Sequence, residues 1–440
     1  MRKSLGAATA EGVVAEVVLA CAGGAVLTGW ALYLGCTTFA IGLLAALPFI
    51  AQVLQLPAVW ISSAFGKRRV AILAVGLSRV ALLPLVVLPF VSWSTGTKQG
   101  VLLGVTAVTA IFGCVGNNAW IAWMGDLVPT TIRGRYFGRR TAICALGGAV
   151  ASLAAGLVLD GLRVDHGHAL AALALVACVA GAFTTLLMSR QHDPSPEGAR
   201  TALPGWSAAL APLSDPAARR WITYLLVWNG AVGLSSAFYA VHMLKNLQIG
   251  FALVAAHAAG VAATRMLCAP LWGRVIDRMG ARPVLVACTF ALTILPAMWV
   301  FTSPERTWII AIDAVLAGTL WSGHTLAAFS LPLAVTPREG RRFCLAIFST
   351  AAGLAFAVAS TSAGALAEMM PESFVIAGST FFGLQVLFAM SSVSRVVAAF
   401  VALRILQPGA RPLDELMPAL RLELARASSS SAASASKFLR

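Results

Sequence analysis

The chain has 440 residues, of which 59% are hydrophobic and only 11% are charged, and its mean hydropathy is +0.84. This composition excludes a soluble monomer, because too little polar surface would be left to face water. The formal net charge of +15 would suit a nucleic-acid partner, but the basic residues lie in short segments between apolar stretches. We therefore expect no binding of nucleic acid.

Twelve apolar stretches follow one another along the chain. A helix of about 20 apolar residues crosses the ~30 Å hydrocarbon core of a bilayer. The predicted spans are 12–34, 38–62, 70–93, 100–124, 141–162, 168–189, 220–243, 249–272, 284–303, 307–332, 343–367 and 375–399. The sequence thus predicts an all-α membrane protein with twelve transmembrane helices.

Lysine and arginine are concentrated in alternate gaps between these spans. The gaps on one side, together with both chain ends, hold 25 of the 32 basic residues, whereas the other side holds Lys98, Arg163, Lys245 and Arg306. Basic loops stay in the cytoplasm because their translocation during insertion is unfavourable. We expect an inner-membrane protein with both termini in the cytoplasm.

The longest gap divides the spans into two groups of six. It covers residues 190–219, contains five prolines and indicates a cytoplasmic linker. We predict an N-terminal six-helix bundle at 1–189, a C-terminal six-helix bundle at 220–402 and a cytoplasmic tail at 403–440 that is amphipathic first and then disordered. Two six-span repeats are typical of transporters that bind their cargo between the halves.

Two loop motifs flank these spans. The motif after the eighth span has the pattern G-x-x-x-D-R-x-G-x-R, formed by Gly273, Asp277, Arg278, Gly280 and Arg282. A degraded copy follows the second span, with Ser63 and Ala64 in place of the aspartate and arginine. The motif after the fourth span consists of Asp126, Pro129, Arg133 and Gly134.

At these residues the chain resembles the major facilitator superfamily, over about residues 10–400. The resemblance implies two pseudo-symmetric bundles that open a central cavity to each side in turn, lined by spans 1, 4, 7 and 10. It also implies a cytoplasmic gate at the two motifs, in which Asp277 faces the start of the fifth span near Arg139 and Arg140. A solvated turn acid is the alternative role for Asp277.

Helical phase on the implied cavity spans predicts the substrate site. Its residues are Trp30, Asn117, Asn118, Trp120, Tyr224, Trp228, Asn229, Tyr239, Trp321 and His324. Aromatic rings that carry a few polar groups suit an amphipathic organic molecule. Rows of aromatic residues along one helix face also occur in helix packing and at the membrane–water interface. The sequence shows neither the many amides expected of a sugar carrier nor the paired cavity arginines expected of a phosphate carrier.

Charged residues inside spans are costly and need a partner or a role. We predict coupling to protons through Asp313, which shares a helix face with His324, with Glu16 and His257 as other candidates. Arg79 is either a structural ion-pair partner or the electrostatic counterpart of the coupling group. Glu16 lies near enough to the end of its span to reach the interface.

Gly147 and Gly156 in the fifth span resemble part of the exporter motif of the superfamily, although Asp160 and Gly161 stand where its Gly-Pro is expected. Close helix packing also explains such glycines. Export is therefore only weakly favoured over import of a nutrient.

The predicted protein is a secondary transporter, not an enzyme. Its partners are a small organic substrate, the lipid bilayer and protons, and we expect a monomer. No P-loop is present and no Cys-x-x-Cys pair occurs, so we expect no cofactor and no metal. A membrane-embedded transferase and a non-transporting receptor or assembly factor are the alternatives from other classes.

Overall fold

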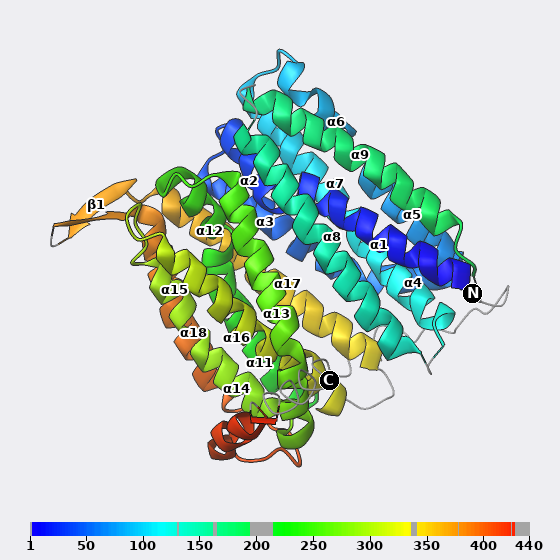
Figure 1. Cartoon of the computed structure of the whole chain (residues 1–440), viewed down its shortest axis with the longest axis vertical. Coiled ribbons are helices and arrows are strands. Elements are labelled where there is room, and N and C mark those ends of the chain that lie inside the picture. Colours follow the sequence, from blue (N-terminus) through cyan, green and yellow to red (C-terminus); the bar gives the residue numbers. More distant parts are fainter. Residues whose placement is uncertain are drawn as a thin grey trace, which may run out of the picture.

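The computed structural model describes residues 2–129, 132–161, 165–193, 214–335, 341–376, 378–423 and 425–426. Most of the predicted linker, at 194–213, and the end of the tail lie outside these residues. The described chain forms two bundles of long helices, one blue to green and one green to orange (Figure 1). The division into two halves follows the order of the sequence.

In the described residues of the N-terminal half, nine α-helical segments follow one another, and α1 with α2 and α5 with α6 each form one span. They are α1 (Arg2–Ala22), α2 (Gly24–Tyr33), α3 (Thr38–Ile50), α4 (Gln55–Phe65), α5 (Lys67–Val80), α6 (Leu83–Val87), α7 (Thr95–Leu127), α8 (Arg133–Gly161) and α9 (His166–Ser189). Short 3-10 turns, η1 (Ala51–Leu54) and η2 (Leu88–Phe90), follow α3 and α6.

The C-terminal half repeats this arrangement. Its helices are α11 (Pro216–Ser236), α12 (Phe238–Val241), α13 (Phe251–Met279), α14 (Ala281–Ala291), α15 (Ile294–Trp299), α16 (Trp308–Val335), α17 (Arg341–Glu368) and α18 (Gly383–Ala402). A π-helical turn, η4 (His242–Asn246), ends the first span of this half, and η5 (Leu413–Glu415) lies in the tail.

The structure confirms a multi-pass helical membrane fold. Within the described residues, eleven helices or continuous helix pairs are long and apolar enough to cross a bilayer. A twelfth span is obtained if the bent pair Thr38–Leu54 and Pro57–Phe65 counts as one. The two parts of this pair meet at 57°, because prolines at positions 48 and 57 remove backbone donors at the bend.

The last span begins later than the sequence suggests. We predicted it from residue 375, but β1 (Ser373–Ile376) and β2 (Ser379–Phe382) form an antiparallel hairpin before α18 begins at Gly383. The hairpin projects from one end of the bundle (Figure 1). Its β-branched and aromatic residues favour strands, and in hydropathy alone they are indistinguishable from the start of a span.

Among the described residues, one buried hydrophobic cluster is shared by the two halves, and it lies at one end. The largest cluster combines Trp30 and Leu170 of the N-terminal half with Phe238, Trp299 and Phe388 of the C-terminal half. The other two clusters each belong to one half. We call the shared end, where α2 and α12 lie, the closed end, and the opposite end, where the chain begins, the open end.

Two helix pairs carry the contact between the halves. Helix α3 packs along α17, and α8 packs along α13. On the first pair, the Ser360 hydroxyl donates to the Gly42 carbonyl at 3.0 Å, and the Thr38 hydroxyl donates to the Gly364 carbonyl at 3.0 Å. A side chain at Gly156 of α8 would lie 2.8 Å from the Ala252 Cα, so only glycine permits this approach.

Candidate functional site

A cavity of about 810 Å³ lies between the two halves. Helices α1, α2, α3 and α8 line it from one half, and α11, α12 and α13 from the other. Most of its lining is alanine, glycine, leucine and valine. The polar side chains on its wall are those of Glu16, Thr28, Ser152, Ser236, Tyr239 and His257. Its size and lining suit a small molecule with an apolar body and few polar groups.

His257 connects the cavity wall to a buried carboxylate. Its Nε2 lies 2.9 Å from Oδ2 of Asp313 on α16, a residue that is only 4% exposed. Asp313 also interacts electrostatically with Arg395 of α18, which is buried and donates to the Leu292 carbonyl at 3.0 Å. The structure thus joins two of the predicted coupling candidates in one pair and places one member at the cavity.

The predicted aromatic residues of α11 and α16 pack together inside the C-terminal half. The Tyr224 hydroxyl is 2.8 Å from Nε2 of His324 and 2.9 Å from the Thr289 hydroxyl. Trp228 stacks on Tyr224 with its ring centroid 6.3 Å away, and it also contacts Trp321. Tyr224, Trp228 and His324 are each less than 5% exposed. They belong to the core of the C-terminal half and are not among the residues that line the main cavity.

A second cavity, of about 310 Å³, lies inside the N-terminal half. Its charged and amide side chains are those of Glu11, Glu16, Arg79, Asn117 and Arg140, and Trp120 also lines it. Glu16 borders both cavities, so the two adjoin at this residue. The structure therefore places two arginines, on α5 and α8, at one small cavity, a pairing that the spacing of the sequence did not indicate.

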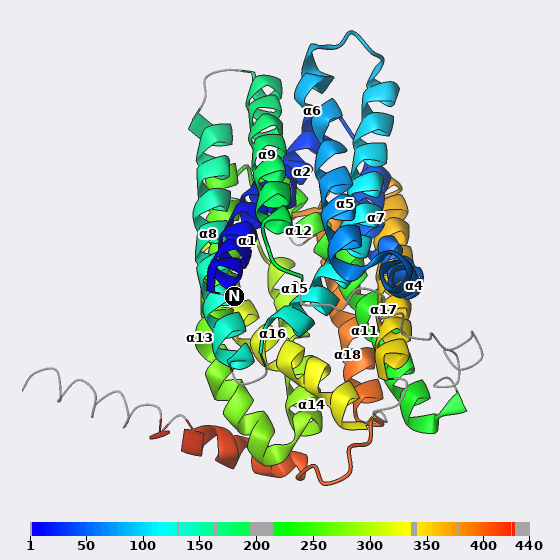
Figure 2. The ribbon, with the colours of Figure 1, turned by 90° about the vertical axis from the view of Figure 1, so that its right-hand side faces the viewer.

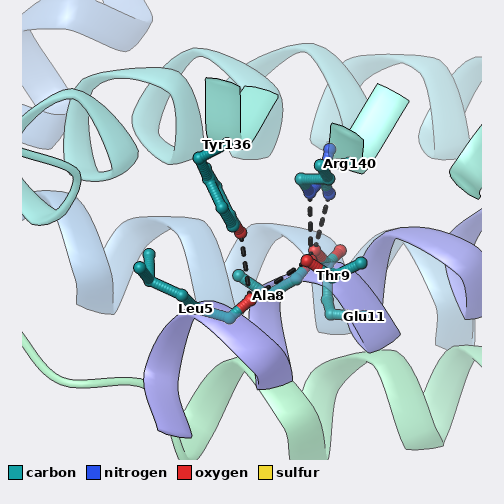
Figure 3. A network of polar contacts seen from close by, with 6 residues as sticks. All are labelled: Leu5, Ala8, Thr9, Glu11, Tyr136 and Arg140. Carbon is teal, nitrogen blue, oxygen red and sulfur yellow. Dashed lines mark hydrogen bonds and ion pairs between the residues drawn. The ribbon is translucent and has the colours of Figure 1, made fainter. Parts of the chain in front are cut away.

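One of these arginines is fully engaged with α1 (Figure 3). The Arg140 guanidinium pairs with Glu11 at 3.1 Å and donates through Nε to the Ala8 carbonyl at 3.0 Å. It also lies over the ring of Trp120, 4.5 Å from the centroid. One turn earlier on α8, the Tyr136 hydroxyl donates to the Leu5 carbonyl at 3.1 Å. These contacts fix the start of α8 to α1.

The remaining predicted cavity residues have other surroundings. Trp30 is fully buried in the core at the closed end, edge-on to Tyr33. Asn118 is half-buried on α7, and Asn229 donates to the Leu225 carbonyl of its own helix at 2.8 Å. Tyr239 lines the main cavity and stacks on Phe388.

The motif after α13 contacts the tail in this conformation. Arg282 donates to the carbonyls of Leu403 and Ile405, at 3.0 and 2.6 Å, and Arg278 pairs with Glu423. Gly280 has a φ of +87°, which explains why the motif needs glycine there. Asp277 is exposed.

Two further gate residues lie in the N-terminal half. Asp126, at the end of α7, pairs with Lys67 at 2.5 Å, which connects the motif after the fourth span to the start of α5, next to the degraded motif after the second span. Arg133 begins α8, and its side chain lies outside the described residues.

Sequence reasoning missed one interaction across the interface. The Asp160 carboxylate of α8 accepts hydrogen bonds from the backbone nitrogens of Phe251 and Ala252, both at 2.8 Å. These are the first residues of α13, whose unpaired donors favour an anion. The signal was present in the sequence, since Asp160 stands where the exporter motif has its Gly-Pro.

Twelve spans in two repeated halves with a cavity between them define a fold family, and the sequence model described as Major Facilitator Superfamily matches residues 13–263. The chain belongs to the major facilitator superfamily. It is therefore a membrane transporter and not an enzyme.

Solved structures of other transporters share this fold. A D-xylose-proton symporter matches with a TM-score of 0.74 at 13% identity, covering 93% of this chain and 100% of that one. The nucleoside transporter NupG matches with a TM-score of 0.68 at 13% identity, covering 92% and 99%. The inward-open xylose transporter XylE from E. coli matches with a TM-score of 0.67 at 13% identity, covering 94% and 99%. No curated protein matches the chain in sequence.

Proposed function

We propose that this superfamily member exports a small amphipathic organic molecule across the inner membrane by alternating access, in exchange for protons. The observation that carries the proposal is the cavity of about 810 Å³ between the halves, with its small apolar lining and few polar side chains. A largely apolar wall favours molecules with an apolar body, and its polar side chains orient them.

The open end of the cavity is the cytoplasmic side in this proposal. The basic loops lie there, and basic loops remain in the cytoplasm during insertion. The structure would then represent an inward-facing conformation, held by the shared core and by Asp160 at the closed end. Movement of the halves about the cavity would expose it to the other side.

Protons are the proposed coupling ion, and the His257–Asp313 pair is the proposed carrier. A single proton can be held between these two side chains, because the His257 Nε2 lies 2.9 Å from Oδ2 of Asp313. His257 borders the cavity whereas Asp313 is behind it, so opening the cavity changes the solvent access of the pair. The proton named for the structurally similar xylose symporter is consistent with this choice.

The proposed direction, export, comes from the glycine spacing of α8, which resembles part of the exporter motif of the superfamily. Gly156 has a packing role against α13, and a side chain at Gly147 would lie 2.9 Å from Val13 of α1. Both glycines therefore serve close packing, and the exporter-like spacing is compatible with import as well. The direction of flux is decided by experiment.

A library assay in proteoliposomes tests the proposal. The full chain is reconstituted and given a mixture of small amphipathic organic compounds, with an imposed pH gradient. Compounds retained by the vesicles are identified by mass spectrometry. Accumulation into an acidic lumen indicates exchange for protons, and accumulation into an alkaline lumen indicates co-transport and overturns export.

Two tryptophan variants on α8 separate transport from leakage. Ala149→Trp fills the cavity that Ala149 lines, and we expect it to abolish accumulation. Leu146→Trp places the same ring one turn away on the outward face, where Leu146 is 68% exposed, and should leave accumulation unchanged. If no compound accumulates in the wild type beyond the level of Ala149→Trp, the transport proposal is wrong.

A further inference from the structure

The small cavity of the N-terminal half holds charges that its own side chains do not balance by contact. It lies between α1, α5, α7 and α8, next to the main cavity, and is lined by Glu11, Glu16, Arg79, Asn117 and Arg140 among others. Arg140 and Glu11 form an ion pair at 3.1 Å, so these two charges are satisfied by each other. The remaining charged pair is Arg79 and Glu16.

The Arg79 side chain makes neither a hydrogen bond nor an ion pair within the part of the chain that the structure describes, and its Nε atom is fully buried. Glu11 acts on it electrostatically but is in contact with Arg140. Arg79 stands in the middle of the third span, packed against Gly181 of α9. A charge at this depth is costly without a counter-ion. Because Glu11 is held by Arg140 at 3.1 Å, the partly buried Arg79 guanidinium has no carboxylate in contact with it among the described residues, which points to an anion supplied from outside the protein.

Glu16 is in the opposite situation. It is half-buried and borders both cavities, and among the described residues it has no hydrogen bond or ion pair of its own. Its carboxylate packs on Gly148 of α8, where a side chain would lie 3.0 Å from Oε2. The junction of the two cavities thus offers an anion, and the small cavity beyond it offers a cation.

We propose that these two residues bind the head group of the transported molecule, and that this molecule is zwitterionic. Its carboxylate would bind the Arg79 guanidinium, with the buried Trp120 Nε1 as a further donor that now lacks an acceptor. Its ammonium would bind Glu16, and its apolar body would lie in the main cavity. The substrate class is an amino acid or similar amino-carboxylate with an apolar side chain.

This inference rests on the proposed transport function and makes it specific. Charge matching supports a zwitterion over a simple anion, because an anion at Arg79 would leave Glu16 unpaired beside it. It also supports a carboxylate over a phosphate, since Arg140 already pairs with Glu11 and, among the described residues that line this cavity, Arg79 is the arginine whose side chain makes no ion pair. A planar carboxylate matches the fork of an arginine.

Three probes of similar shape test the head-group site. They are L-phenylalanine, L-phenylalaninamide, which lacks the carboxylate, and 3-phenylpropionate, which lacks the ammonium. Binding to the purified full chain in detergent is measured by isothermal titration calorimetry. We expect L-phenylalanine to bind roughly 10-fold or more tightly than either of the others, because each loses one charge-assisted contact.

Substitutions at the two residues should remove one preference each. Arg79→Met should bind L-phenylalaninamide as well as L-phenylalanine, and Glu16→Gln should bind 3-phenylpropionate as well as L-phenylalanine. Arg265→Met, at an exposed arginine of α13 that donates to Thr325, should keep both preferences. Arg79→Lys keeps the charge and should retain a weakened preference for the carboxylate.

A stability measurement separates a binding role from a structural one. If the role of Arg79 is to bind a ligand, the midpoint of thermal unfolding of ligand-free Arg79→Met stays at or above that of the wild type, because a charge without a contacting partner has been removed. A lowered midpoint, equal affinities of the three probes, or an unchanged carboxylate preference in Arg79→Met overturns the proposal. Transport in the library assay without binding of any probe overturns this site alone.

Discussion

Asp160 of α8 and Phe251 of α13 join the two halves through a carboxylate at a helix N-terminus, with 2.8 Å between Oδ1 and the backbone nitrogen. The second oxygen accepts from Ala252 at the same distance. Both residues lie at the closed end, beside the shared core. The contact can form only while this end is shut, so it contributes to the stability of one conformation and not the other.

The first prediction concerns this cap. Asp160→Asn should shift the population toward the conformation open at this end, because it removes the charge that the helix N-terminus attracts. Because Asp160 is exposed, the interaction contributes about 0.3–1 kcal/mol, or roughly 2- to 5-fold in population. Impermeant thiol labelling of a cysteine placed at Thr28, in a cysteine-free background, measures the accessibility of the cavity from this side.

Asp165→Asn is the matched control for this experiment. Asp165 lies near the same end, but it pairs within its own half, with His168 at 3.6 Å. Its substitution should leave labelling at Thr28 unchanged. Equal labelling of the Asp160 and Asp165 variants would show that the cap does not hold the end closed.

The second prediction concerns proton coupling. Asp313→Asn should abolish accumulation driven by a pH gradient and spare counterflow exchange, which needs no net proton movement. The physical reason is that the amide cannot take up or release the proton that His257 shares at 2.9 Å. Both activities are measured in proteoliposomes with a cargo identified by the library assay.

His257→Gln extends this test to the residue at the cavity. It should reproduce the loss of accumulation, whereas His168→Gln, at an exposed histidine near the closed end, should not. An Asp313→Asn protein that still concentrates its cargo in proportion to the gradient would give Asp313 a structural role. Glu16 would then be the next residue to examine.

The sequence predicted the fold well because membrane insertion depends on features that are local in the chain. Span length, loop charge and the midpoint linker all act through stretches of about 20 residues. The bend after Ile50 and the hairpin before Gly383 were not predicted. The bend follows from the missing backbone donors of its prolines and the hairpin from hydrogen bonds between two adjacent strands, and hydropathy encodes neither.

The site was less predictable than the fold. Helical phase identifies which residues of one helix share a face but not which residues that face contacts. Tyr224 and His324 were predicted to line the cavity, and in the structure they contact each other at 2.8 Å in the core of the C-terminal half. The sequence also did not indicate which side chains of different helices lie together, and Arg79 on α5 and Glu16 on α1, which line the same cavity, are an example. The acid–helix contact of Asp160 had a sequence signal, but only the structure supplies its partner.

The third prediction is the orientation of the chain in the membrane. Single cysteines at Lys245 and Glu305 should react with an impermeant thiol reagent added outside intact cells, and cysteines at Arg69 and Arg404 should not. All four positions are exposed in the structure, so a negative result reports location and not burial. Labelling from outside at Arg69 or Arg404 would reverse the assigned topology and the inward-facing assignment with it.

The fourth prediction concerns the motif aspartate. In the opposite conformation, in which the open end closes, we expect Asp277 to meet the start of α8 near Arg139 and Arg140. Asp277→Asn should therefore slow transport without affecting folding, measured as initial rate at equal expression. Ser63→Asn, in the degraded copy of the motif, should have a far smaller effect, and equal defects would contradict the asymmetry between the two loops.

The fifth prediction concerns the tail, which lies across the end of the C-terminal bundle below α14 (Figure 2). Glu423 is 1% exposed and pairs with Arg274, Arg278 and Arg426. Glu423→Gln leaves the two arginines of α13 without their anion and should release the tail. The guanidinium groups are partly exposed, so we expect a loss of about 1–2 kcal/mol, below the 3–5 kcal/mol of a fully buried pair.

Limited trypsin digestion of the folded protein measures this release. A contact weakened by about 1–2 kcal/mol raises the open population roughly 5- to 30-fold, and cleavage after Arg404 should accelerate to match. Glu415→Gln is the control, because Glu415 pairs only with Arg411 at the surface, at 3.4 Å, among the described contacts. Such exposed pairs contribute about 0–1 kcal/mol, so its cleavage rate should stay near that of the wild type. Equal rates for the wild type and Glu423→Gln would mean that the tail is held by its backbone contacts to Arg282 and not by the buried glutamate.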